Sequence, residues 1–146
     1  MPTVGEFFGG CSGTLASALR LSLADAGEIE VRFKGEQLAS AAVSTLERTL
    51  NQLERLSGRS RSEVSYFALH EPNPRVIQIL AQRARIPLEK IPLISRTQGN
   101  LGSATCGVSL CAALNMAHAN EVASARPLIF LAAVGPGLLW GGTYVR

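Results

Sequence analysis

Residues 64–84 read VSYFALHEPNPRVIQILAQRA, which is a short apolar run, a polar turn and then a second, periodic run. The apolar run, Val64–Leu69, predicts a buried strand. The periodic run, Pro74–Ala84, predicts a helix in which Asn73 is the N-cap and Pro74 takes the first helical position. A buried strand followed directly by a helix indicates a layered α/β fold.

Two further helices are predicted, one on each side of this stretch. Apolar residues recur at three- and four-residue steps through Glu36–Leu56, which predicts an amphipathic helix that ends at Gly58. The stretch Gly102–Ala119 is uncharged and predicts a helix that is apolar nearly all round. Such a helix is expected to be buried on all sides.

Short apolar or alternating runs predict four more strands. One alternates apolar and charged residues, one is weak, and the last two are joined by the tight turn Gly135-Pro136-Gly137. They are Glu28–Phe33, Ile91–Ser95, Leu128–Val134 and Leu138–Val145. Strands that alternate with helices predict a largely parallel sheet with helices on both faces, and the tight turn makes the last strand antiparallel.

The predicted fold is therefore α/β, with a five-stranded mixed sheet. Residues 1–27 are expected to form an irregular N-terminal segment, apart from a short helix over Ser12–Leu23. Residues 28–146 are expected to form one domain, and no repeat or linker interrupts them.

Composition excludes several classes of protein. The chain is 47% hydrophobic and 17% charged, so some apolar surface is expected to face a partner. The net charge of +3 is mild and no aromatic residues are interleaved with basic ones, so we expect no nucleic-acid binding. The three cysteines show no disulfide framework and no metal-ligand spacing, which predicts no metal site and a reducing, cytoplasmic setting.

No membrane segment is expected. The N-terminus lacks the basic region and apolar core of a signal peptide. Two long stretches, Thr97–Asn120 and Pro127–Val145, are uncharged, but the first carries several polar side chains and the second is broken by its Gly-Pro-Gly turn. Neither stretch predicts a lipid-facing span.

Three motifs occur in the order found in a known enzyme family. They are His70-Glu71-Pro72-Asn73 at a strand end, Gln98-Gly99-Asn100-Leu101 before a buried helix, and the final stretch Ala133–Gly141; the helix entry Phe33-Lys34-Gly35 fits the family as well. From about Glu28 to Arg146 the chain resembles the C-terminal half of a β-ketoacyl-acyl-carrier-protein synthase III, of the thiolase-like superfamily. Each motif alone is weak, and the evidence lies in their order and spacing.

The resemblance implies half of a thiolase-like fold and an acyltransferase of fatty acid or polyketide biosynthesis. In this family a cysteine attacks an acyl thioester, and His and Asn side chains bind the thioester oxygen, where each donor is worth roughly 3–4 kcal/mol. These roles fall to His70 and Asn100, and the family's oxyanion loop falls at Gly135, Pro136 and Gly137. The residues alone leave a second interpretation open, in which His70 and Asn100 have no role beyond local structure.

Three departures from the family's motifs bear on the chemistry. Glu71 replaces a Gln and, if buried, could raise the pKa of His70. Val134 replaces a Phe and removes a bulky wall. Pro136 has no N–H to donate, although backbone amides of this loop help to bind the oxyanion in the family. These departures favour a weakened or altered acyl transfer.

The family's nucleophilic cysteine lies in the N-terminal half of a duplicated fold, and no matching segment is present. We therefore expect the isolated chain to be inactive and to need a missing N-terminal half, a partner chain or a second copy. Cys11, in a Gly-rich turn, is the candidate for a self-contained nucleophile, whereas Cys106 and Cys111 are expected to be core residues. A non-catalytic half-fold that pairs with a partner chain or with itself is the competing hypothesis.

The substrate that the resemblance implies is an acyl-CoA or acyl-carrier-protein thioester, with no bound cofactor. Five basic residues follow His70 in the sequence, and they either form a solvated face or help an acidic carrier protein to dock. The family's carrier-docking position falls at Arg75. The five are Arg75, Arg83, Arg85, Lys90 and Arg96.

Overall fold

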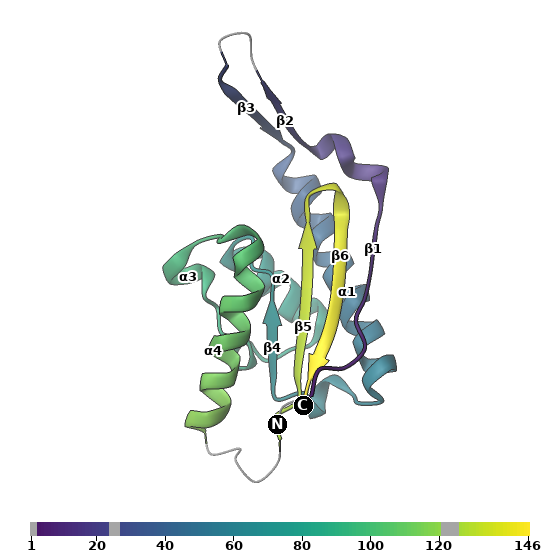
Figure 1. The fold of residues 1–146 in the computed structure, drawn as a ribbon, viewed down its shortest axis with the longest axis vertical. Helices are drawn as coiled ribbons and strands as arrows, with labels where there is room; N and C mark the ends of the chain where they lie inside the picture. Colours follow the sequence, from purple (N-terminus) through teal and green to yellow (C-terminus); the bar gives the residue numbers. More distant parts are fainter. Residues whose placement is uncertain (1–2, 24–26, 121–125) are drawn as a thin grey trace.

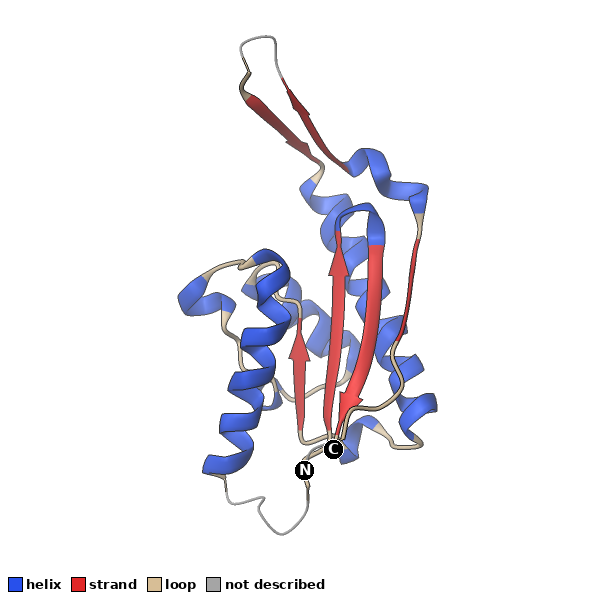
Figure 2. Ribbon diagram, in the orientation of Figure 1, coloured by secondary structure: helices blue, strands red, loops and turns tan. Residues whose placement is uncertain are grey.

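The computed structural model describes residues 3–23, 27–120 and 126–146, which form a four-stranded sheet and a separate two-stranded hairpin. The strand order of the sheet is β1-β6-β5-β4 (Figure 1), and helices lie on both of its faces (Figure 2). The predicted α/β class is confirmed. The strands of the sheet are β1 (Phe8–Cys11), β4 (Tyr66–Leu69), β5 (Ile129–Gly135) and β6 (Leu139–Val145).

The strand pairings correct the predicted sheet. β4 and β5 are parallel, whereas β5–β6 and β1–β6 are antiparallel. The antiparallel final strand was predicted, but the sequence also predicted five strands in a largely parallel sheet. Among the described residues the sheet has four strands and a single parallel pairing, because two of the predicted strands are not part of it.

Two of the predicted helices cover one face of the sheet. They are α1 (Gly35–Ser57) and α2 (Pro74–Ala84), which pack against each other. The side chain of Asn73 accepts a hydrogen bond from the backbone N–H of Val76 at 3.0 Å, as an N-cap does. Gly58, with φ of 65°, ends α1 in the left-handed conformation that glycine adopts without strain.

The main core lies between these two helices and the sheet. Phe67 of β4 and Phe130 of β5 meet edge to face with 6.0 Å between ring centroids, and both are fully buried. Such a contact is worth about 0.5–1.5 kcal/mol beyond its buried area. Aliphatic side chains of α1 and α2 pack around the pair; they include Leu46, Leu50, Leu53, Ile77 and Leu80.

Gly142 allows α1 to lie close to the middle of the sheet. A Cβ atom at this position would lie 2.9 Å from Cγ2 of Thr49 and 3.0 Å from the carbonyl oxygen of Leu131. Both distances are shorter than an unstrained carbon contact of about 3.5–4.0 Å. The glycine therefore sets the spacing between α1 and β6.

The opposite face of the sheet is covered by α4 (Thr105–Ala119), which lies along β4 (Figure 1). The expectation that this helix is buried all round is wrong, because Cys111 and Asn115 are exposed. Its buried stripe is narrow and consists of Thr105, Ser109, Ala113 and Ala117. In the described part of the chain, no helix is long and apolar enough to span a membrane.

The N-terminal part of the chain also departs from the prediction. The strand expected over Glu28–Phe33 exists as β3 (Ile29–Phe33), but it pairs with β2 (Leu19–Leu23) in a hairpin that projects from the body (Figure 1). Residues 1–27 were expected to be irregular apart from a helix over Ser12–Leu23. The described part of this segment instead contains β1, a 3₁₀ helix at Gly13–Ala18 and β2. Every residue of β3 is exposed, so its alternating pattern does not mark a sheet that faces a core.

The strand predicted over Ile91–Ser95 is absent. A 3₁₀ helix at Leu88–Lys90 precedes this segment and the short helix α3 (Ser95–Gln98) follows it. Ile91 and Ile94 are buried, which explains the apolar signal in the sequence. The backbone N–H groups of Ile94 and Ser95 bind the side chain of Glu71 instead of a neighbouring strand.

We expect Leu50→Ala to lower the free energy of unfolding by about 2–5 kcal/mol, because it leaves a cavity in the core between α1 and the sheet. Leu50 is fully buried. Urea denaturation followed by circular dichroism measures the change. The matched control is Leu23→Ala in the hairpin, where Leu23 is 78% exposed and the expected change is within about 0.5 kcal/mol. Equal effects of the two substitutions would contradict this assignment of the core.

Candidate functional site

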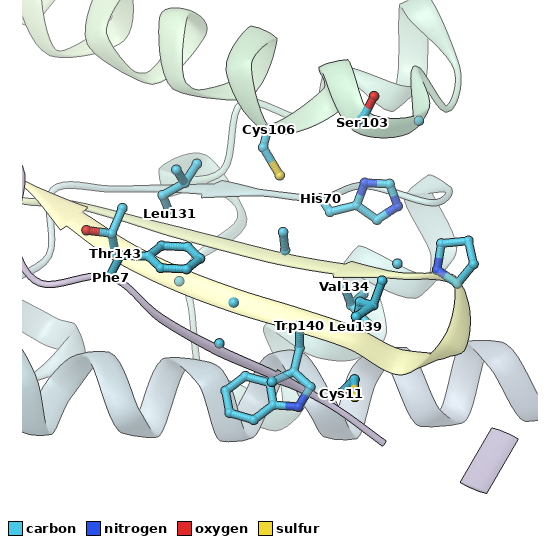
Figure 3. A pocket seen from close by; sticks show the side chains of 18 of the residues that line it. Phe7, Cys11, His70, Ser103, Cys106, Leu131, Val134, Leu139, Trp140 and Thr143 are labelled. Atoms are coloured by element: carbon cyan, nitrogen blue, oxygen red, sulfur yellow. The ribbon is translucent and has the colours of Figure 1, made fainter. Parts of the chain in front are cut away.

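Four of the residues singled out in the sequence meet at one pocket. This pocket, called here the large pocket, has a volume of about 930 Å³ and is lined by β1, β5, β6 and the start of α4. His70, Asn100, Gly135 and Pro136 all line it, although they come from distant parts of the sequence. Figure 3 shows Ser103 and Cys106 on one side of the large pocket and Trp140 and Cys11 on the other.

His70 directly follows β4. Its backbone N–H donates to the carbonyl of Ala132 at 2.9 Å, which continues the pairing of β4 with β5. The residue therefore lies at the C-terminal edge of the parallel strands, the edge at which open α/β sheets place their ligand sites. The His70 side chain is half-buried.

Burial lowers the pKa of His70 below the ordinary 6.5, because removal from water disfavours the charged ring. The negative charge of Glu71 and a hydrogen bond to the Gly102 backbone act in the opposite direction, but more weakly. Glu71 therefore raises the pKa of His70, as expected, but burial lowers this pKa by more. At pH 7 the ring is neutral.

Glu71 itself is fully buried. Its carboxylate accepts hydrogen bonds from the backbone N–H of Ile94 at 3.2 Å, the backbone N–H of Ser95 at 3.0 Å and the Ser95 hydroxyl at 2.7 Å. A buried carboxylate needs such donors to offset its desolvation. Glu71 therefore links the end of β4 to the segment that leads to Asn100.

Asn100 lies in the turn between α3 and α4. Gly99, with φ of 71° and ψ of −161°, ends α3, and the Asn100 side-chain oxygen accepts a hydrogen bond from the backbone N–H of Gly102 at 2.9 Å. Among the described residues the side-chain nitrogen of Asn100 has no protein partner, so it is available to donate to a ligand. Asn100 is exposed.

The turn between β5 and β6 forms one wall of the site. Pro136–Leu138 is a 3₁₀ helix with left-handed backbone at Gly137 (φ of 73°) and Leu138 (φ of 49°). Gly135 and Pro136 line the large pocket, whereas Gly137 is not among its lining residues. Pro136 offers no N–H at this wall.

A second pocket, of about 360 Å³, lies on the other side of the same residues. It shares His70, Asn100, Val134, Gly135 and Pro136 with the large pocket. Its other walls are mostly apolar and come from the hairpin, α1 and α2; they include Leu19, Phe33, Leu38, Ala42 and Val76. The candidate site residues thus lie between two pockets, and both can be reached from solvent or from a partner.

Two of the three cysteines line the large pocket. Cys11 is exposed at the end of β1, and Cys106 is half-buried at the start of α4. Burial raises the pKa of Cys106 to about 11, so its thiol is protonated at neutral pH. Cys111 lies on the exposed side of α4 and not in the large pocket, so the expectation that it is a core residue is wrong.

The basic residues after His70 divide into two groups. Arg83 forms an ion pair with Glu47 at 2.8 Å, and Lys90 donates to the carbonyls of Ser62 and Val64. These two have roles in the fold. Arg75 is exposed at the start of α2, beside a shallow pocket of about 490 Å³ that it lines with Arg83.

Sequence reasoning missed several residues of the site. Ser103, Leu131 and Thr143 line the large pocket, and none belongs to a motif. Side chains alternate between the two faces of β5 and β6, so the sequence could have indicated which of their residues share a face. It gave no sign that part of this face forms a pocket and is not covered by other described elements. Among residues 3–23, 27–120 and 126–146, no group of three His, Cys, Asp or Glu side chains could hold a metal ion.

Comparison with known proteins gives the family. Residues 55–146 match the family model described as 3-Oxoacyl-[acyl-carrier-protein (ACP)] synthase III C terminal. The chain belongs to this family. The match covers the last part of α1, β4, α2, α4 and the β5–β6 pair, and therefore His70, Asn100 and the Gly135–Gly137 turn, but not Cys11.

Individual relatives agree with the family model. The chain is 30% identical over 116 residues to the β-ketoacyl-[acyl-carrier-protein] synthase III of Aquifex aeolicus, a match that covers 80% of the chain and 36% of the relative. The structure of the Aquifex aeolicus enzyme superposes with a TM-score of 0.75 at 28% identity, and that of the Pseudomonas aeruginosa PAO1 enzyme with 0.81 at 20% identity. Each superposition covers 98% of the chain and 44% of the solved structure, so the synthase III fold is shown for less than half of the relatives' length.

We expect an NMR titration to place the pKa of His70 below 6.5, because desolvation outweighs the charge of Glu71. A His118→Gln variant assigns the signals, since the chain has two histidines. The unfolded chain then binds more protons than the folded chain between the lowered pKa and 6.5. The free energy of unfolding should therefore fall as the pH drops through this window, and His70→Gln should remove that part of the slope. A pKa of 6.5 or higher would contradict the assignment.

We expect iodoacetamide at neutral pH to modify Cys11 and Cys111 well before Cys106, because only the thiolate reacts and the pKa of Cys106 is about 11. Peptide mass spectrometry of quenched samples measures the three rates. Between neutral pH and the pKa, the rate at Cys106 should rise about tenfold per pH unit. Equal labelling of all three cysteines at neutral pH would show that Cys106 is not held as a protonated thiol.

Proposed function

We propose that the chain supplies the oxyanion-binding side chains, His70 and Asn100, of a 3-oxoacyl-acyl-carrier-protein synthase III-like acyltransferase. The observation that carries the proposal is that both residues line one pocket together with Gly135 and Pro136. The family assignment supports it, because the relatives are named as synthases of this type. The setting is fatty acid or polyketide biosynthesis in the cytoplasm.

The proposed chemistry has two steps. A thiolate attacks the carbonyl carbon of an acyl thioester, the carbon–sulfur bond to the donor breaks and the donor thiol leaves. Loss of carbon dioxide from a malonyl thioester then supplies the electron pair that attacks the acyl carbon, and the enzyme thiolate departs. In both steps negative charge develops on the acyl oxygen, where His70 and Asn100 would donate hydrogen bonds.

The state of His70 constrains this role. A neutral imidazole carries a single N–H, so His70 can donate only one hydrogen bond. The thioester oxygen would need that N–H, whereas Asn100 has both of its side-chain N–H groups available. Since Pro136 contributes no backbone N–H, the side chains would carry more of the stabilisation than the turn does.

The nucleophile is proposed to come from a polypeptide segment that this chain does not contain. The chain covers 36% of the Aquifex aeolicus relative, and the large pocket is open on a mostly apolar surface. A completing N-terminal half, a partner chain or a second copy would cover that surface and the exposed side of α4. We therefore propose that the isolated chain is inactive.

One observation favours a different enzyme. Cys11 is exposed and lines the same pocket as His70 and Asn100, so a self-contained cysteine acyltransferase is the second candidate. Cys106 lines the pocket as well, but its raised pKa makes it a poor nucleophile at neutral pH.

The partners follow from the same chemistry. The substrate is proposed to be an acyl-CoA or acyl-carrier-protein thioester, with no bound cofactor. Arg75 is exposed, lines the pocket of about 490 Å³ and is the proposed contact for an acidic carrier protein, where opposite charge mainly speeds encounter.

The first test is intact-mass spectrometry of the isolated chain after incubation with acetyl-, octanoyl- and palmitoyl-CoA. We expect no adduct, because the nucleophile is elsewhere. An adduct that Cys11→Ala abolishes and Cys111→Ala retains would overturn the half-enzyme proposal in favour of the self-contained one. Both cysteines are exposed, so Cys111 controls for non-specific acylation.

The second test separates a catalytic half from a non-catalytic one. The chain is tagged in its source cells, purified with the polypeptides that bind it, and assayed for condensation of acetyl-CoA with a malonyl carrier protein. His70→Ala and Asn100→Ala should each lower the rate about 10²–10³-fold, as loss of an oxyanion donor does. His118→Ala, at the exposed end of α4, is the matched control. Unchanged activity in His70→Ala would favour the non-catalytic half-fold.

A further inference from the structure

We propose that Glu71 is a positioning residue that fixes Asn100 relative to His70. The inference deepens the function proposed above and rests on it, because it concerns the same two side chains. A series of links carries it, called here the Glu71 ring: Glu71 to Ser95, through α3 to Asn100, from Asn100 to Gly102, and from Gly102 to His70, which lines the same pocket and precedes Glu71 in the chain.

The links of the Glu71 ring are hydrogen bonds, the chain itself and a shared pocket. The Glu71 carboxylate accepts hydrogen bonds from Ile94 and Ser95 at the start of α3. Asn100 follows α3 after Gly99, and its side-chain oxygen accepts from the N–H of Gly102 at 2.9 Å. Gly102 lines the large pocket together with His70, which is bonded to Glu71 in the chain. The two proposed oxyanion donors are thus joined through a path that includes Glu71.

The N–H groups of Ile94 and Ser95 require that both terminal atoms of the Glu71 side chain accept hydrogen bonds. One Glu71 oxygen accepts from the N–H of Ile94, and the other accepts from the N–H and the hydroxyl of Ser95. A Gln at this position would place its NH₂ group against one backbone N–H in either orientation. One buried donor would then lose its partner, which a carboxylate avoids.

The residues between Ser95 and Asn100 need this anchor because they have few others. Ile91, Ile94 and Ser95 are buried, but the chain leaves the core after Ser95, and α3 is four residues long. Residues 96–100 are all exposed, so packing does not hold them. The buried Glu71 carboxylate therefore supplies the fixed point from which the turn carrying Asn100 extends.

The test is NMR spectroscopy of the whole chain without substrate, on E71Q, S95A and the control E63Q. Glu63 also accepts from a serine N–H and hydroxyl, those of Ser60, but it is exposed and precedes β4, whereas His70 follows the other end of that strand. We expect E71Q to shift the side-chain NH₂ signals of Asn100 and the amide signal of Gly102, and to lower the pKa of His70 further. The ring signals of Phe67 and Phe130 report whether the core is intact.

S95A separates position from charge. It keeps the Glu71 charge and removes one hydrogen bond, so a shift of the Asn100 and Gly102 signals in S95A supports positioning. It also decides the question if E71Q does not fold. Unchanged Asn100 and Gly102 signals in every folded variant of this pair, or equal shifts in E63Q, would overturn the proposal.

The NMR test distinguishes a failure of the Glu71 proposal from a failure of the proposed function. The NMR signals are read without substrate, so shifted signals together with activity unchanged by His70→Ala would leave the Glu71 ring standing and remove its catalytic meaning. Unchanged signals together with the expected loss of activity would remove the Glu71 ring and leave the function.

Discussion

The parallel pairing of β4 with β5 is the constraint on which the site depends. It sets Phe67 against Phe130 in the core and brings both strands to the same edge, where His70 follows one and the Gly135–Pro136 turn follows the other. Because parallel neighbours are usually covered on both faces, α1 and α2 occupy one side and α4 the other. A change of register would move His70 and the turn apart.

The same sheet leaves apolar surface without a covering layer in the described residues. β1 and β6 end in a large, mostly apolar pocket, α4 buries only small residues, and Leu23, Ile29 and Phe33 of the hairpin are largely exposed. A monomer rarely exposes this much apolar surface. The high hydrophobic content of the sequence therefore has a physical location, and it is consistent with relatives of which the chain covers less than half.

Local signals in the sequence predicted α1, α2 and three strands of the sheet, β4, β5 and β6, whereas features that depend on residues distant in the chain were not predicted. The N-cap Asn73 and the left-handed Gly58 act within a few residues, so α2 and the end of α1 were predictable. The strand over Ile91–Ser95 failed because its backbone donors bind a carboxylate more than twenty residues earlier in the chain. The motifs identified His70 and Asn100, but not the pockets on both sides of them, since those depend on how β1 and the hairpin fold back.

Two departures from the family's motifs bear on the same candidate residues. One removes a hydrogen-bond donor near His70 and Asn100, and the other adds a buried acceptor. Pro136 removes a possible backbone donor from the turn, which places more weight on the side chains of His70 and Asn100. Glu71 adds a buried carboxylate that holds the segment bearing Asn100. Whatever fills the large pocket touches His70, Asn100 and Pro136, and so does whatever fills the second pocket. An occupant of either pocket would therefore contact the same candidate residues, and in the proposal above the hydrogen bonds of Glu71 would limit how far Asn100 moves in response.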